Sequence, residues 1–300
     1  KKKALISRKL VQLKNDVPIK QKLETFTLRD IDKEKLYDFL REMEFNRLLS
    51  QVISHYGDPI DKKNNNSDKK LTSKTNLEVL KKFNLNKYET ILKIDELEKW
   101  IKKIKDKKIV AVDTETNSLN PHEAKLVGIS LSIDDGIACY IPLEHDKEKI
   151  LDKKIVLEKL KKILEDESIK KIGQNIKYDN IILKKNKINV YPIEDTMLAS
   201  YTLDAGLNRH NLDILSEIHL GHKTISFKDL VGSGKKKVSF TDIDLKRATE
   251  YAGEDADVTF RLFKLFKQRL DKEKLTKIYE IFEKPMVKVL SEIETNGVKV

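Results

Sequence analysis

The chain has 300 residues, of which 39% are hydrophobic and 36% charged, and its formal net charge is +11. This length allows one large or two modest domains with hydrophobic cores, and the composition is typical of a globular protein with a very polar surface. No apolar run approaches the roughly 20 residues that a membrane span requires, and no signal-peptide pattern opens the chain, so we expect a cytoplasmic protein with no membrane partner.

The positive charge comes mainly from lysine, with 52 Lys against eight Arg. Because compositional drift can produce such an excess, the charge alone favours a nucleic-acid partner only modestly. The single cysteine, Cys139, excludes an intrachain disulfide and a thiolate metal cluster. It lies in an apolar run, which is typical of a core position.

Residues 1–57 are expected to form a small α/β unit. Residues 5–13, LISRKLVQL, alternate well enough for a strand, and Asp32 is placed to cap an amphipathic helical pattern that extends to Gly57. Residues 58–75 are polar and almost without large apolar side chains. Such a composition cannot offset the entropy of an ordered chain, so we predict a mobile linker there.

The second expected unit covers residues 76–270 and opens with a strand, KYETILKI, and a helix, DELEKWIKKI, capped by Asp95. The next strand, KKIVAVDTET, is followed by LVGISLSID and GIACYIPL, which are joined at Asp135-Gly136, a strong hairpin signal. These three strands are predicted to form an antiparallel meander. A helix, a short strand and another helix starting near Lys177 come next, and this order resembles the ribonuclease-H-like α/β fold, a mixed sheet flanked by helices.

Two acids end the strand KKIVAVDTET. Asp113 and Glu115 are two residues apart, so on a strand they share one face. Their mutual repulsion calls for a cation between them, and carboxylate oxygens suit Mg²⁺ or Mn²⁺ better than zinc. A strand that ends in a solvated acidic turn would also carry two acids at this spacing. The pair alone therefore does not establish a metal site.

Three more polar residues belong to the candidate site. Asp179 stands four residues after Asn175 at the opening of a helix, and Tyr251 and Asp255 stand four apart on one face of a late helix. Alanines at 248, 252 and 256 permit that helix to pack closely. Each acid taken singly also has a structural explanation, as a helix N-terminal charge or as a solvated surface group.

Together, D-x-E on a strand, N-x-x-x-D at a helix start and Y-x-x-x-D on a late helix resemble the three motifs of the proofreading 3′-5′ exonucleases. The resemblance is closest to bacterial DNA polymerase I and extends to DTETNSL, LVGISLSI, IGQNIKYD, DTMLASY, LNRHNLDILSE and ETNGVKV. It implies that residues 1–57 are the end of a 5′-nuclease region, 76–270 the exonuclease domain and 271–300 a helix leading into a polymerase domain of the same polypeptide.

The resemblance also implies a two-metal mechanism on DNA. Asp113 would bridge two divalent ions, Mg²⁺ or Mn²⁺, with Glu115 and Asp255 on the ion that activates water and Asp179 on the ion that stabilises the leaving oxygen. Tyr251 would orient the attacking water, because a phenol with a pKa near 10 is a poor base at neutral pH. All five would act as catalytic residues.

For the single-stranded 3′ end of a primer-template, the resemblance places Leu119 as a wedge between bases. It implies that Gln174, Asn175 and Tyr178 contact the terminal nucleotides, and that Arg209 and Phe227 line the path of the strand. Leu119 as a loop hydrophobe, Phe227 as a core residue and Arg209 as a surface charge are the alternative interpretations. A monomer is expected.

Two other functions remain open at this point. One is a ribonuclease D-like 3′ RNA-processing exonuclease, which shares the acids and the tyrosine. The other is an inactive exonuclease fold that serves as a scaffold or DNA clamp. The inactive fold predicts lost acids, whereas all four acids stand in place here.

Overall fold

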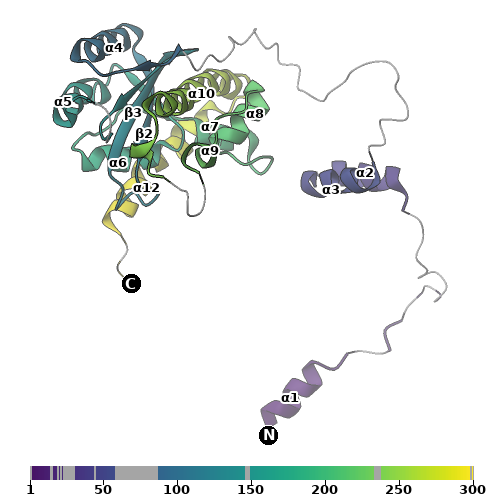
Figure 1. Ribbon diagram of the computed structural model, residues 1–300. Helices are drawn as coiled ribbons and strands as arrows, with labels where there is room; N and C mark the ends of the chain where they lie inside the picture. Colours follow the sequence, from purple (N-terminus) through teal and green to yellow (C-terminus); the bar gives the residue numbers. More distant parts are fainter. Residues whose placement is uncertain are drawn as a thin grey trace, which may run out of the picture. The chain divides into compact units, whose positions relative to one another are not determined.

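The computed structural model describes residues 2–13, 16–18, 20, 22, 31–43, 45–57, 87–145, 149–232, 238–297 and 299. The chain divides into two compact units, Lys1–Ser73 and Lys74–Val300, each of which is considered by itself (Figure 1). The linker predicted for residues 58–75 lies outside the described residues. Within those described ranges, no helix combines the length and the hydrophobicity needed to cross a membrane.

The first unit differs from the sequence-based expectation. The strand predicted at residues 5–13 is wrong, because α1, Lys2–Leu10, is a helix. Its Leu5 and Leu10 side chains are well exposed, and no neighbouring strand is present among the described residues of this unit. A lone strand would leave its backbone groups without partners, whereas a helix satisfies them within the segment.

Two short helices, α2 (Lys33–Glu42) and α3 (Asn46–Tyr56), pack against each other. The Asp32 side chain accepts a hydrogen bond from the Lys35 backbone N–H at 3.2 Å, so the predicted N-cap is confirmed. Gly57 ends α3 with a positive φ of 82°, also as predicted. The helical pattern is not continuous, however, because a turn at Met43 separates the two helices.

The described residues of the second unit form a mixed six-stranded sheet in the order β1-β4-β3-β2-β5-β6. The central three strands, β2, β3 and β4, form the predicted antiparallel meander, while β1 pairs with β4, β5 with β2 and β6 with β5 in parallel. The strands are β1 Glu89–Thr90, β2 Ile109–Thr116, β3 Leu126–Asp134, β4 Ile137–Pro142, β5 Lys170–Gly173 and β6 Ile193–Asp195.

Helices cover both faces of this sheet (Figure 1). Helices α4, α5 and α6 pack on one face and the long α10 on the other, as their shared core residues and contacts indicate. The helical elements are α4 Ile94–Lys107, α5 Lys153–Leu164, α6 Ile176–Lys185, α7 Thr196–Asp204, α8 Leu212–Leu220, α9 Phe227–Val231, the 3₁₀ turn η5 Phe240–Asp242, α10 Leu245–Lys272, α11 Thr276–Ile278, the π-helical turn η6 Tyr279–Glu283 and α12 Lys284–Asn296.

The period-two alternation of the strands assigns their side chains to the two faces. Val110 and Val112 of β2 join a core with Trp100 of α4, while Ala111 between them contacts Phe260 and neighbouring residues of α10. The predicted core position of Cys139 is confirmed, since its side chain is buried, and Trp100 is buried as well. The N-cap of α4 is Lys93 rather than Asp95, and the Glu96 carboxylate accepts the Lys93 backbone N–H at 3.1 Å.

The segment after α10 belongs to the same compact unit. The hydroxyl of Tyr279 in η6 is buried, donates to Glu194 at 3.0 Å and accepts the Asp195 backbone N–H at 2.9 Å. Helix α12 packs on α6 through contacts that include an ion pair between Lys177 and Glu294 at 2.5 Å. The C-terminal segment therefore contacts both β6 and the helix that carries Asp179.

The hairpin between β3 and β4 depends on Gly136, whose φ is +75°. Replacing Gly136 with Ala places a Cβ in the left-handed region, so we expect the free energy of unfolding to fall by about 1–2 kcal/mol in urea denaturation. Gly136→Asn is the matched control, because asparagine tolerates this conformation better and should lose less. Equal losses for the two variants would contradict this explanation.

Candidate active site

The end of β2 delivers two acids to the face of the sheet that α10 covers. Asp113 pairs with Ser130 of β3, and Glu115 pairs with Gly128, so all four positions lie on one face. Glu115 is 6% exposed, whereas Asp113 is partly open to solvent. The predicted strand and the predicted common face of the two acids are both found.

Asp179 reaches the same place from α6. Strand β5 pairs with β2 only as far as Ala111 and Ile172, and the chain then turns into α6, so the outer edge of β2 is open beyond that pair. Asp179 fills the opening: its Oδ1 accepts the Thr114 backbone N–H at 3.0 Å and the Thr114 hydroxyl at 2.5 Å. The strand edge thereby fixes the orientation of this carboxylate.

Helix α10 contributes the remaining pair. Tyr251 and Asp255 lie one turn apart on the same face of this helix. The helix approaches the sheet closely because Ala248, Ala252 and Ala256 are all fully buried. One carboxylate oxygen from each of Asp113, Glu115 and Asp255 falls within a group in which all the atoms lie within 4.8 Å of one another. Asp179 is not a member of that group. Its carboxylate is hydrogen-bonded to Thr114, which lies between Asp113 and Glu115 in β2.

The four acids strongly perturb one another. Burial raises the pKa of Asp113 to about 6, and it raises the pKa values of Glu115, Asp179 and Asp255 well above the usual range for carboxyls. The charge of Asp113 adds to the rise at each of the other three. Burial and then the charge of Asp255 raise the pKa of Tyr251, so this phenol stays protonated.

These residues fit a divalent cation. The Glu115 Oε1 atom is buried and has no hydrogen-bond partner among the described residues, which is costly for a carboxylate unless a cation or water binds it. The donor set consists of carboxylate oxygens alone, which is the preference of Mg²⁺ and Mn²⁺. A bound cation would also offset the repulsion that raises the carboxyl pKa values.

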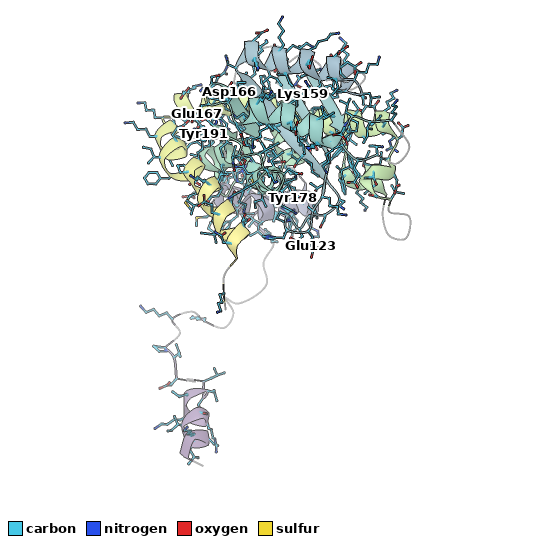
Figure 2. All side chains as sticks on the ribbon, turned by 90° about the vertical axis from the view of Figure 1, so that its left-hand side faces the viewer. Glu123, Lys159, Asp166, Glu167, Tyr178 and Tyr191 are labelled. Atoms are coloured by element: carbon cyan, nitrogen blue, oxygen red, sulfur yellow. The ribbon has the colours of Figure 1, made fainter. Side chains whose placement is uncertain are left out.

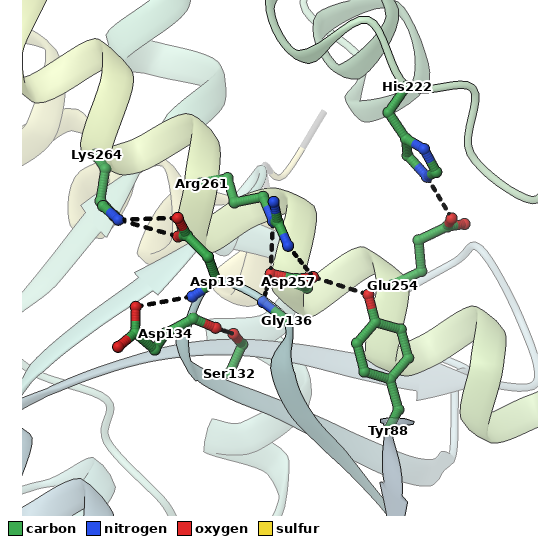
Figure 3. Close-up of polar contacts among 10 residues, drawn as sticks. All are labelled: Tyr88, Ser132, Asp134, Asp135, Gly136, His222, Glu254, Asp257, Arg261 and Lys264. Atoms are coloured by element: carbon green, nitrogen blue, oxygen red, sulfur yellow. Dashed lines mark hydrogen bonds and ion pairs between the residues drawn. The ribbon is translucent and has the colours of Figure 1, made fainter. Parts of the chain in front are cut away.

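A polar network fixes α10 over the sheet (Figure 3). The buried Asp257 carboxylate accepts hydrogen bonds from Arg261 at 2.9 Å, from the Gly136 backbone N–H at 2.9 Å and from the Tyr88 hydroxyl at 2.8 Å. Glu254, also buried, accepts the Ile225 N–H and is paired with His222, both at 2.6 Å. Sequence reasoning missed both acids, although their places beside Asp255 in GEDAD could have suggested that they point to other sides of the helix.

Asp195 is a third acid that sequence reasoning missed. Its carboxylate caps α7 by accepting the Met197 and Leu198 N–H groups at 2.8 and 3.2 Å, and it also accepts the Ile176 N–H at 2.9 Å. Burial raises its pKa to about 6 in spite of these bonds. Asp195 therefore joins the starts of two helices, one of which carries Asp179, and an aspartate directly before a helical run was the available signal.

The residues expected to contact the terminal nucleotides lie beside the acids. Asn175 is the N-cap of α6 with a φ of +55°, and the Gln174 side chain donates to the His210 carbonyl at 2.7 Å. The Tyr178 hydroxyl is already engaged by Thr116 and by the Ser118 carbonyl, each at 2.6 Å. Figure 2 shows Tyr178 at the same end of the domain as Glu123.

The three expected strand-path residues are all exposed. Leu119 is 93% exposed in the loop after β2, which excludes a core role for it. Phe227 is 41% exposed, and its ring centroid lies 6.1 Å from that of Tyr251, so it borders the site. Arg209 is exposed in the loop that the Gln174–His210 hydrogen bond ties to the start of α6.

A mixed sheet with helices on both faces and an acidic cluster at the end of its central strand defines a ribonuclease-H-like 3′-5′ exonuclease fold. A family model described as 3′-5′ exonuclease matches residues 88–271. The chain belongs to this 3′-5′ exonuclease family, in the form found in bacterial DNA polymerases I.

Several DNA polymerases I are similar to the chain. That of Rhizobium leguminosarum is 42% identical over 73% of this chain and 23% of its own length. Those of Pseudomonas aeruginosa and Borreliella burgdorferi are 33% and 34% identical over 98% and 99% of this chain, but over only 32% and 33% of their own lengths. The chain thus spans about a quarter to a third of these relatives.

Among solved structures, Brucella melitensis NrnC with bound Mg²⁺ is 28% identical, with a TM-score of 0.51 over 63% of this chain and 86% of its own. Escherichia coli RNase D, described as an exoribonuclease involved in structured RNA processing, is 17% identical, with a TM-score of 0.53 over 70% of this chain and 51% of its own. The second likeness concerns the fold alone.

The raised pKa of Asp113 makes the stability of the metal-free protein depend on pH. The pKa of Asp113 is about 6 in the folded state and near 3.9 in the unfolded state, so the folded state binds the carboxyl proton more tightly. The stability that this proton contributes is lost as the pH rises through 6. In EDTA at pH 7.5 we expect Asp113→Asn to be more stable than the wild type by on the order of 1–3 kcal/mol. Urea unfolding should show the difference shrinking as the pH falls from about 6 to about 4, and a pH-independent difference would refute the assignment.

The network around Asp257 predicts a large loss of stability when it is broken. Asp257→Ala leaves Arg261, which is buried, without its carboxylate partner, so we expect a loss of about 3–5 kcal/mol in urea unfolding. Lys264→Ala on the same helix removes a half-exposed ion pair with Asp135 and should cost at most about 1 kcal/mol. A small loss for Asp257→Ala would show that α10 is held mainly by its apolar contacts.

Proposed function

We propose that the chain is the proofreading 3′-5′ exonuclease part of a DNA polymerase I. It would hydrolyse the 3′-terminal phosphodiester of single-stranded or frayed DNA and release nucleoside 5′-monophosphates. The convergence of Asp113, Glu115 and Asp255 from β2 and α10 into one group is the observation that carries this proposal. Membership of the exonuclease family and the similarity to DNA polymerases I support it.

The proposed cofactors are two divalent cations, Mg²⁺ or Mn²⁺. When bound, they would activate the attacking water and neutralise charge on the scissile phosphate. Asp113 would serve both ions, Glu115 and Asp255 the one near the attacking water, and Asp179 the other. The grouping of three carboxylates around Asp113, with Asp179 held separately by Thr114, is consistent with this division.

Tyr251 is assigned to orient the attacking water. Burial and then the charge of Asp255 raise its pKa, which argues against a role as a general base near neutral pH because the phenolate would be scarce. As a phenol it can donate one hydrogen bond and accept another, and its ring packs against Phe227 and Phe240 beside the carboxylates. Its hydroxyl is therefore suited to positioning rather than to proton abstraction.

The strand end would approach over exposed apolar and basic side chains. Leu119 would insert between the terminal bases, and Phe227 would border the sugar or base next to Tyr251. Gln174, Asn175 and Tyr178 would contact the terminal nucleotides, although Gln174 and Tyr178 also hold neighbouring loops through their own hydrogen bonds. Arg209 would pair with a phosphate further along the strand.

The remaining parts of the proposal concern the larger polypeptide. By its similarity to DNA polymerases I, the chain would act in DNA replication and repair in the cytoplasm, as a monomer, with residues 271–300 leading towards a polymerase domain. Residues 1–57 would be the end of a 5′-nuclease region. The polymerase and 5′-nuclease activities would both reside outside these 300 residues.

The acids and the tyrosine should separate in a single-turnover assay on a 3′-mismatched primer with Mg²⁺ or Mn²⁺. We expect Asp113→Ala and Asp255→Ala to fall to the level of an EDTA control, because each removes a cation ligand. Tyr251→Phe should lose about 10²-fold and keep a measurable rate. Glu250→Ala, which alters a surface ion pair next to Tyr251, is the control and should keep wild-type activity.

Rates on matched substrates would test the choice of nucleic acid. The substrates are a mismatched DNA primer-template, single-stranded DNA and single-stranded RNA of the same sequence. We expect the digestion rate to decrease in that order, with RNA digested most slowly. Faster trimming of RNA would favour a ribonuclease D-like function. Full binding of DNA with no cleavage in Mn²⁺ would favour an inactive clamp.

A further inference from the structure

A row of polar side chains continues from the acids across the sheet. Asp113 of β2 pairs with Ser130 of β3, which pairs in turn with Tyr140 of β4. In an antiparallel ladder, directly paired residues point to the same face. Ser130 and Tyr140 therefore lie on the face of Asp113 and Glu115, beneath α10.

Three buried polar atoms on this face have no hydrogen-bond partner in the part of the chain that the structure describes. They are Glu115 Oε1, Ser130 Oγ and Tyr140 Oη. Burial of such a group without a partner is unfavourable, and each case in a native protein needs an explanation. Because these three atoms lie at neighbouring positions on one face of the sheet, we look for one explanation that covers all three.

Gly128 shows where the Tyr140 hydroxyl lies. A Cβ at Gly128 would overlap the ring and the hydroxyl of Tyr140, so the phenol lies directly over this glycine. Gly128 is the strand partner of Glu115, and paired side chains in a sheet are about 5 Å apart at Cβ. The absence of a side chain at Gly128 thus lets the Tyr140 hydroxyl occupy the space next to Glu115.

The surroundings keep Tyr140 in this position and in its neutral form. Its ring packs against Phe240, with centroids 6.3 Å apart, and Phe240 packs in turn against Tyr251 at 6.2 Å. Burial, and then the charge of Glu115, raise the pKa of Tyr140. The group beside Glu115 is therefore a hydrogen-bond donor, and Glu115 Oε1 is an acceptor.

We propose that Tyr140 is a positioning residue for the metal site. Its hydroxyl donates to one buried water that is shared with Ser130 Oγ and Glu115 Oε1, and this link fixes the orientation of the Glu115 carboxylate at the cation site. Three polar partners are enough to hold such a water. This inference rests on the proposed cation-dependent function and extends it to a residue behind the ligands.

The test measures Mn²⁺ binding, by calorimetry and by electron paramagnetic resonance, with the full 300-residue chain. Tyr140→Phe should bind Mn²⁺ about tenfold more weakly, because loss of such an outer partner usually lowers metal affinity by 10–100-fold. Ser130→Ala should change affinity in the same direction by less. In nuclease assays, the Mg²⁺ concentration for half-maximal rate should rise for Tyr140→Phe while the KM for DNA stays within about twofold.

Tyr88→Phe is the matched control. It removes another buried phenol hydroxyl beneath α10, one that binds Asp257 rather than a site acid, so its Mn²⁺ affinity should equal that of the wild type. Near-ultraviolet circular dichroism would establish that each variant is folded. If Tyr140→Phe does not fold, Ser130→Ala decides in its place, and unchanged Mn²⁺ affinity there would overturn the proposal.

A double-mutant cycle with Glu115→Ala separates positioning from general loosening of the fold. The Tyr140→Phe effect on Mn²⁺ affinity should largely disappear when Glu115 is absent, and an equal effect in both backgrounds would overturn the proposal. Wild-type Mn²⁺ affinity in Tyr140→Phe would overturn it as well, whatever the nuclease activity. A wild-type chain that binds Mn²⁺ without cutting DNA would contradict the proposed function while leaving this comparison valid.

Discussion

The burial of four neighbouring carboxylates is the constraint around which the second unit is built. Burial raises the pKa values of Asp113, Glu115, Asp179 and Asp255, and the charge of Asp113 adds to the rise at the other three, so the metal-free site opposes folding. The surrounding structure holds them together through contacts that do not involve a cation. These contacts are the β2 pairing with β3, the Thr114 bonds to Asp179 and the Asp257 network beneath α10.

Each acid is therefore held by a different kind of local structure. Asp113 and Glu115 depend on the alternation of a central strand, Asp179 on an open strand edge, and Asp255 on the close approach of an alanine-rich helix face. Asp195 adds a further link, since it joins the start of α6 to α7. Such rigid support is what a cation site needs, because ligand directions must be set before the cation arrives.

The sequence predicted those parts of the site that follow from short-range periodicity. A spacing of two on a strand and of four on a helix placed Asp113 with Glu115 and Tyr251 with Asp255, and the hairpin at Asp135-Gly136 followed from its turn residues. It did not predict the roles of Glu254 and Asp257, because most of their partners, such as His222 and Tyr88, lie far from them in the sequence. The strand predicted at residues 5–13 was wrong for a related reason: alternation alone does not supply a partner strand.

Close packing limits substitution along this sheet face. Gly128 has to remain small for Tyr140 to lie over it, and Ala252 has to remain small for α10 to approach. These positions carry no chemistry of their own. They are nevertheless required for the polar row from Asp113 to Tyr140 to exist beneath a helix.

The contacts of η6 and α12 have a mechanical consequence for the site. Tyr279 binds the strand end at Glu194 and Asp195, and Glu294 binds Lys177, which lies two residues before Asp179 in α6. A force applied to the C-terminal helix would therefore be transmitted to the carboxylate that stands apart from the other three. The position of Asp179 relative to the other three acids would then respond to strain in the C-terminal helix.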